Sequence, residues 1–166
     1  MPKIETHDAT PRADASKKLA GRLLALDLGE KRVGMAVSDE LCITVRPLAA
    51  LARTNWKQLL RQVSDALKSF DAQALVIGLP LRMDGTEGDA ALVARRTARN
   101  FELSLDVPVY LQDERLTSLE AEEALRAAGV SDDALRRERL DSEAAAIILR
   151  DFIERERGGR ALTSNT

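Results

Sequence analysis

Two apolar segments separated by only three residues constrain the fold of this chain most strongly. Residues 22–28 (RLLALDL) and 32–38 (RVGMAVS) each have the length and composition of a buried strand, and Gly-Glu-Lys lies between them. A connection this short joins antiparallel neighbours, because parallel strands need a crossover of a dozen or more residues. The sequence therefore predicts a β-hairpin at residues 22–38.

Strands and helices alternate after this hairpin. Further strands are expected at residues 43–46, 72–80 and 107–112, the first of them ended by Pro47. Helices are expected to start at Thr54 or Asn55, at Thr86, at Thr117 and at Asp141. This order predicts an α/β fold with a mixed β-sheet, antiparallel in its first strands and then parallel, flanked by helices.

The chain has 166 residues, enough for one domain with a hydrophobic core, which we expect at residues 21–156. Residues 1–20 are polar and are expected to form a disordered extension, and residues 157–166 a flexible tail. No apolar stretch has the length of a membrane span, and the first residues lack the apolar centre of a signal peptide. We therefore expect a cytoplasmic protein with no membrane partner.

Charge and aromatic content limit how a nucleic acid could be recognised. The formal net charge of −2 gives no support for such a partner, and 3% aromatic residues argue against a base-stacking platform. Arginines do cluster at residues 95–99 and 136–139, and a solvent-exposed helix face is the simpler explanation for the first cluster. A bound nucleic acid would therefore be recognised by its backbone and shape.

Acidic residues stand where two predicted strands end and where the last helix is expected to start. They are Asp27, the adjacent pair Asp113 and Glu114, and Asp141. Each has an ordinary explanation on its own: a turn-capping Asp, a local ion pair with Arg115, or a helix cap. Together they favour a hard divalent cation, because Mg²⁺ prefers oxygen ligands and two such ions about 4 Å apart promote phosphodiester cleavage.

Asp113 and Glu114 are not expected to join Asp27 together. Adjacent residues on an extended chain point to opposite faces, so only one of the two easily reaches the same site. Glu114 has the longer side chain, but the residues themselves leave the choice open.

Single residues exclude several other kinds of site. The only histidine, His7, lies in the polar extension, so no Ser–His–Asp set is expected. The only cysteine, Cys42, rules out an internal disulfide and a Cys-rich metal site. GEKRVG has the outer glycines of a P-loop, but Met35 and Ala36 stand where Lys and Ser or Thr are needed.

Four segments resemble the signature blocks of the YqgF family, also called the RuvX or pre-16S rRNA nuclease family. They are ALDLGEKRVGMAVSD, VIGLPLRMDGTEG, LQDERLTSLEAEEAL and DSEAAAIILRDFI, in this order. The resemblance covers most of residues 21–156. It implies a fold similar to ribonuclease H and to the Holliday-junction resolvase RuvC, and a nuclease that uses Mg²⁺ or Mn²⁺.

The resemblance also assigns roles to residues. The catalytic acids it implies are Asp27, Asp113, Glu114 and Asp141, with Asp27, Glu114 and Asp141 as the metal ligands. Expected contacts to the substrate come from Lys31, Arg32, Arg82 and Arg115. For Arg32 and Arg115 an ion pair with the neighbouring acids is the alternative. The glycines of the GLPLRMDGTEG block, with the helix expected after Thr86, would offer backbone amides to a phosphate, or would form an ordinary turn.

The function expected from the resemblance is metal-dependent endonucleolytic hydrolysis of RNA, in 5′-end maturation of pre-16S rRNA. One alternative is a nuclease for DNA junctions, which would share the same catalytic parts. Another is a non-catalytic module that binds transcription or ribosome-assembly factors. LDLGEKRVG also resembles the phosphate loop of actin-like phosphotransferases, but those proteins need two such domains and this chain has room for one.

Overall fold

The computed structural model describes residues 19–115, 117–129 and 133–161. Its strands are β1 (Arg22–Leu28), β2 (Arg32–Ser38), β3 (Val45–Ala52), β4 (Ala72–Leu79) and β5 (Val109–Asp113). Its helices are α1 (Trp56–Ser69), α2 (Asp89–Ser104), α3 (Thr117–Ala127) and α4 (Asp133–Ala161). Strands and helices therefore alternate after an opening hairpin, as expected.

The five strands form one mixed sheet in the order β3-β2-β1-β4-β5. β1 pairs antiparallel with β2 and β2 antiparallel with β3, whereas β4 pairs parallel with β1 and β5 parallel with β4. The predicted α/β architecture is confirmed. Because β1, β4 and β5 run in the same direction, their carboxyl ends meet at one edge of the sheet.

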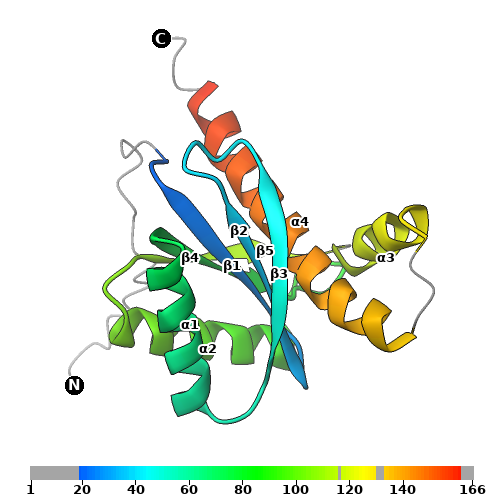
Figure 1. The fold of residues 1–166 in the computed structure, drawn as a ribbon, viewed down its shortest axis with the longest axis horizontal. Helices are drawn as coiled ribbons and strands as arrows, with labels where there is room; N and C mark the ends of the chain where they lie inside the picture. The colour runs from blue at the N-terminus through cyan, green and yellow to red at the C-terminus, as the bar shows by residue number, and fades with distance from the viewer. Residues whose placement is uncertain (1–18, 116, 130–132, 162–166) are drawn as a thin grey trace, which may run out of the picture.

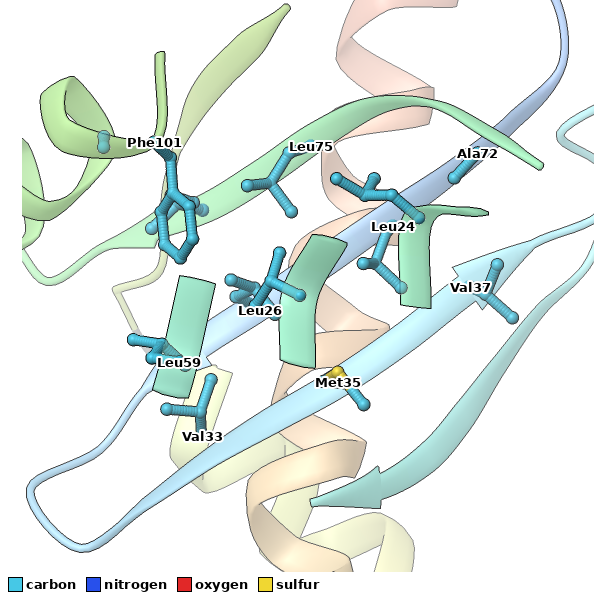
Figure 2. Packing of buried hydrophobic residues seen from close by; sticks show 13 residues of the cluster. Leu24, Leu26, Val33, Met35, Val37, Leu59, Ala72, Leu75 and Phe101 are labelled. Carbon is cyan, nitrogen blue, oxygen red and sulfur yellow. The ribbon is translucent and has the colours of Figure 1, made fainter. Parts of the chain in front are cut away.

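Helices cover both faces of the sheet (Figure 1). α1 and α2 lie on one face, where apolar side chains of β1, β2 and β4 converge on Leu59 of α1 and Phe101 of α2. Figure 2 shows this packing, with Leu24, Leu26 and Val33 pointing from the strands into the space between the layers. Alternate residues of the strands thus supply one core under α1 and α2 and another on the opposite face.

α4 covers the opposite face, and α3 packs on α4 (Figure 1). Leu23 and Ala25 of β1 belong to this second core, together with the small side chains of Ala145 and Ala146 in α4. Small residues at the contact allow the helix axis to lie close to the sheet. The backbone of α4 lies against β2 at Gly34, where an added Cβ atom would overlap the Asp141 carbonyl.

The bounds of two predicted strands need correction. β3 starts at Val45 and continues through Pro47 to Ala52, although Pro47 was expected to end it. Pro47 pairs with Ala36 on an edge strand, where a missing N–H costs no interior ladder hydrogen bond. The last strand begins at Val109 and includes Asp113.

The predicted helix starts are partly wrong. Asn55 caps α1 as expected, accepting a hydrogen bond from the Gln58 N–H at 2.9 Å. α2 starts at Asp89 rather than at Thr86, because the Thr86 N–H and hydroxyl both donate to Asp84 in the preceding turn. α4 starts at Asp133, so Asp141 is not a helix cap but lies two turns inside the helix.

The expected chain ends are only partly within the described part. Residues 1–18 lie outside it, and the expected tail at 157–166 begins with helix, since α4 continues to Ala161. Across the described helices, none combines the length and apolar character required to cross a bilayer.

Candidate active site

Asp27 occupies the penultimate position of β1, on the face covered by α4. Leu23 and Ala25 fix this orientation, because side chains alternate along a strand and both pack beneath α4. Its cross-strand neighbour in β2 is Gly34, which has no side chain to fill the space beside the carboxyl group. The Asp27 carboxylate therefore lies at the end of a buried strand, on the face that α4 covers, beside a position without a side chain.

Glu114 reaches Asp27 from the end of β5, which is separated from β1 by β4 in the sheet. Its backbone N–H continues the sheet by donating to the Leu79 carbonyl at 3.1 Å. Its carboxyl group lies directly above Gly78 of β4, close enough that a Cβ atom on that glycine would overlap it. There it forms a hydrogen bond with the carboxyl group of Asp27.

Burial and like charge perturb both carboxyl groups. Burial raises the pKa of Asp27 to about 6, with a further rise from the charge of Asp141, while the hydrogen bond from Glu114 opposes this shift. Burial also raises the pKa of Glu114 to about 8, and the charge and hydrogen bond of Asp27 add to that rise. The two carboxyl groups therefore titrate as one coupled pair, which holds a proton to higher pH than separate, exposed carboxyl groups would.

Asp113 takes no part in this pair. Its carboxylate accepts from the Arg115 Nε at 2.8 Å and Nη2 at 2.7 Å, and from the Arg115 backbone N–H at 3.0 Å. Burial acts to raise the pKa of Asp113, but the hydrogen bonds and charge of Arg115 outweigh it and lower that pKa. Of the two adjacent acids, Glu114 therefore joins Asp27 and Asp113 forms a separate ion pair.

Asp141 approaches the pair from α4. Its charge raises the pKa of Asp27, yet its own Oδ2 accepts a hydrogen bond from the Arg32 Nε at 3.1 Å. Within residues 19–115, 117–129 and 133–161, no three or more His, Cys, Asp or Glu side chains are grouped closely enough to hold a metal ion. The structure therefore assembles Asp27 with Glu114, and Arg32 holds Asp141 at the border of the site.

The chemistry of the donor set fits a hard divalent cation at its centre. Two adjacent carboxyl groups supply the oxygen ligands that Mg²⁺ and Mn²⁺ prefer, and their raised pKa values report mainly the cost of burying charge at this position. Asp141 would add a third carboxylate if its ion pair with Arg32 were replaced by a contact with the cation.

Three of the basic residues expected to contact the substrate lie in segments that follow β1, β4 and β5. Lys31 is exposed in the turn between β1 and β2. The Arg82 guanidinium lies against Gly88, the N-cap of α2, and an Arg115 nitrogen lies beside Gly85 in the same loop. Gly88 supplies no side-chain cap to the first turn of α2. Arg82 and Arg115 thus meet at the loop 80–88, next to uncapped helix amides.

Two of the three arginines at 95–99 form exposed ion pairs. Arg95 pairs with Glu87, and the Arg99 Nη1 lies 2.9 Å from the Glu102 Oε2. This agrees with the expected solvent-exposed face of α2. In the second cluster, the side chains of Arg136 and Arg137 lie outside the described part.

Some residues that shape the site were not singled out from the sequence. The Arg53 side chain donates to the Gly29 carbonyl at 2.7 Å, and its backbone N–H donates to the Lys31 carbonyl at 2.9 Å. These two hydrogen bonds hold the β1–β2 turn beside Asp27. Nothing in the sequence around Arg53 indicates this role. Gly34 does carry a signal, because a glycine inside a strand pattern indicates close approach of another backbone.

Comparisons with known proteins agree with this architecture. The family model RuvX, described as Holliday junction resolvase, matches residues 21–155. The chain belongs to the RuvX family. A "Putative pre-16S rRNA nuclease" of Anaeromyxobacter dehalogenans (strain 2CP-C) is 44% identical over 134 residues, 81% of this chain and 97% of that protein. One of the same name from Lactobacillus acidophilus is 36% identical over 139 residues, 82% of this chain and 98% of that protein.

A solved structure supports the fold of this RuvX-family chain. T. thermophilus RuvC, in complex with a Holliday junction substrate, superimposes with a TM-score of 0.52 at 15% sequence identity, covering 81% of this chain and 95% of RuvC. The ribonuclease H-like fold predicted from the resemblance is thus confirmed. The chain therefore belongs to a family of nucleases, enzymes that hydrolyse phosphodiester bonds.

Proposed function

We propose that the chain is a metal-dependent endonuclease that cleaves RNA in the cytoplasm, with the 5′ end of pre-16S rRNA as its substrate. The observation that carries this proposal is the hydrogen-bonded pair Asp27 and Glu114 at the carboxyl edge of the parallel strands, with Asp141 beside it. Strongly raised pKa values in a group of carboxyl side chains are typical of functional sites. The names of the curated relatives favour this RNA over other substrates.

Asp27 and Glu114 would hold Mg²⁺ or Mn²⁺, with Asp141 as a third ligand. When bound, such ions activate water and stabilise the leaving oxygen of the cleaved phosphodiester. Arg32 of β2 holds the Asp141 carboxylate, which lies close enough to Asp27 for its charge to raise the pKa of Asp27. In this arrangement Asp113 is a positioning residue that acts through Arg115, rather than a ligand.

The substrate backbone would be bound by the basic residues around this edge. Arg82 and Arg115 lie at the loop 80–88 beside the uncapped start of α2, where backbone amides and guanidinium groups both favour an anion. Lys31 lies in the turn that follows Asp27. Contacts of this kind bind phosphates without reading bases, which suits a chain with few aromatic residues.

Cleavage by an Asp27→Asn variant tests the proposal. With Mg²⁺ or Mn²⁺ and a pre-16S rRNA fragment, we expect cleavage to fall by about 1,000-fold or more, about 4 kcal/mol of lost transition-state stabilisation. The fold should persist, since an amide of the same shape removes the charge that burial disfavours. Full activity of a nuclease-free preparation of this variant would reject the assignment.

A nuclease for DNA junctions is the second candidate, and the description of the matching family model favours it. A four-way DNA junction assayed beside the RNA fragment ranks the two substrates. A non-catalytic module for ribosome-assembly or transcription factors would need no metal. Calorimetric titration with Mg²⁺ and Mn²⁺ distinguishes it from both nucleases.

A further inference from the structure

Asp27 is flanked by a glycine on each neighbouring strand. Gly34 of β2 is its registered partner. Gly78 of β4 follows Ile77, which pairs with Leu26, so Gly78 is the next position along from that pair and lies beside Asp27. By strand alternation both glycines face α4, as Asp27 does. The row across β2, β1 and β4 at this level therefore contains one carboxylate between two positions without side chains.

Space, not backbone conformation, accounts for these glycines. The glycines with positive φ among the described residues are Gly21, Gly85 and Gly129, so neither Gly34 nor Gly78 needs the left-handed region. On the same face, Ala36 of β2 and Val76 of β4 are two residues away and pack normally beneath α4. On this face, the positions of β2 and β4 that lack a side chain are the two beside Asp27.

The space beside each glycine is filled by atoms of another acidic residue: the Glu114 side chain at Gly78 and the Asp141 backbone at Gly34. A Cβ atom on Gly78 would overlap the Glu114 Oε2 and would stand 2.7 Å from the Ile148 Cδ1. A Cβ atom on Gly34 would overlap the Asp141 carbonyl and stand 2.9 Å from the Ser142 nitrogen. Real Cβ atoms essentially never approach other heavy atoms so closely.

We propose that Gly34 and Gly78 are positioning residues that assemble the acidic site around Asp27. Gly78 leaves the space through which the Glu114 carboxyl group reaches Asp27. Gly34 allows the backbone of α4 to lie on β2, which brings Asp141 to the same carboxylate. The consequence for metal binding rests on the proposed function, whereas the placement of the acids does not.

Metal titration of Gly78→Ala tests the consequence. We measure Mn²⁺ binding to the full chain by calorimetry, for the wild type, Gly78→Ala and the control Gly158→Ala, whose Cβ would have nothing within 4 Å. Displacing Glu114 should weaken Mn²⁺ binding by about 10–100-fold, the usual effect of disturbing the support of a metal ligand. Gly158→Ala should bind as the wild type does. Equal Mn²⁺ affinity in Gly78→Ala and the wild type overturns the proposal.

A second measurement tests the placement without metal or activity. Gly78→Ala is combined with two backgrounds. The first is Ile148→Val, which lacks the Cδ1 atom, and the second is Ile148→Val together with Glu114→Ala. The Tm of each protein is measured in EDTA. If the added methyl group displaces the Glu114 carboxyl group, Gly78→Ala should lower Tm at least about twofold more in the background that keeps Glu114. The reason is that substitutions at contacting residues do not have additive effects. Equal decreases in the two backgrounds overturn the placement. A wild type that binds no Mn²⁺ would count against the proposed function, and this measurement would still decide the role of Gly78.

Gly34→Ala makes a sharper demand on the fold. Its added atom meets the backbone of α4 rather than a movable side chain, so we expect a larger decrease in Tm than for Gly78→Ala, and no relief from Glu114→Ala. Relief of the Gly34→Ala defect by Glu114→Ala would contradict the separate roles of the two glycines.

Discussion

Asp113 and Glu114 are adjacent in the chain, but their carboxyl groups lie in opposite electrostatic environments. Asp113 is paired with Arg115, and its pKa is lowered. Glu114 is half-buried beside another acid, the described residues show no ion pair between it and a basic side chain, and its pKa is raised to about 8. Residue type cannot explain the difference, because both are carboxylic acids. The direction in which each side chain leaves the end of β5 explains it.

The comparison separates two uses of an acid. An acid paired with an exposed arginine contributes little to stability and holds a loop in place. An acid held next to a second acid costs stability, and such an arrangement persists where function requires it. The following predictions address this contrast, from the largest expected effect to the smallest.

Cleavage activity should distinguish the two neighbours. Glu114→Gln should reduce Mn²⁺-dependent cleavage by about 1,000-fold or more, because one of the two central carboxylates is lost. Asp113→Asn should reduce it by about 10-fold or less, because only the support of Arg115 is weakened. Rates measured at saturating Mn²⁺ on one RNA fragment provide the check. Equal losses in the two variants would break the contrast.

Stability in EDTA should depend on pH in opposite ways for the two acids. The pKa of Glu114 is higher in the folded chain than its ordinary 4.5, so between about pH 4.5 and 8 the folded state binds more protons than the unfolded state. The free energy of unfolding therefore falls as the pH rises through this window. Glu114→Gln should remove most of this fall and raise Tm at pH 8 by about 5 °C, as expected for about 2 kcal/mol in a domain of this size.

The lowered pKa of Asp113 has the opposite sign. Its stabilisation is present above the ordinary pKa of an Asp and is lost as the pH falls through the lowered value. Because the ion pair is partly exposed, Asp113→Asn should lower Tm at pH 7 by only about 1–2 °C. Thermal unfolding of both variants across pH 4–8 provides the comparison. An increase in the Tm of wild-type protein from pH 5 to pH 8 in EDTA would contradict the raised pKa of Glu114.

The smallest effect is expected from Arg115. Arg115→Ala should leave the acid pair intact, so the rate at saturating RNA should change by about threefold or less. The KM for RNA should rise by about 10-fold, and the dependence of binding on salt should weaken by about one phosphate contact. A KM unchanged by the substitution would show that Arg115 serves the Asp113 ion pair alone.

Local sequence signals predicted the parts of the fold that depend on local chemistry. The three-residue connection after Leu28 leaves only a hairpin, and Asn55 caps a helix by its own side chain. The position of Asp27 near the end of a buried strand was likewise visible in the sequence. What these features share is that the deciding contacts lie within a few residues.

Some of the features that were predicted wrongly or left open depend on contacts distant in sequence. Pro47 can continue β3 only because that strand is at the sheet edge, which the order of strands decides. The start of α4 is a different case, because residues 133–140 contain good helix formers without a stop signal, and this local pattern lets the helix begin before Asp141. The choice between Asp113 and Glu114 depends on the pairing of Gln112 with Gly78, which sets the face that each acid meets.

A crystal structure of the chain soaked in Mn²⁺ tests the central claim most directly, because anomalous scattering locates the ion independently of the side chains. We predict an ion bound between carboxylate oxygens of Asp27 and Glu114, with Asp113 still paired to Arg115. An ion bound at Asp113, or an occupied site in which Asp27 and Glu114 share no ion, would contradict the account.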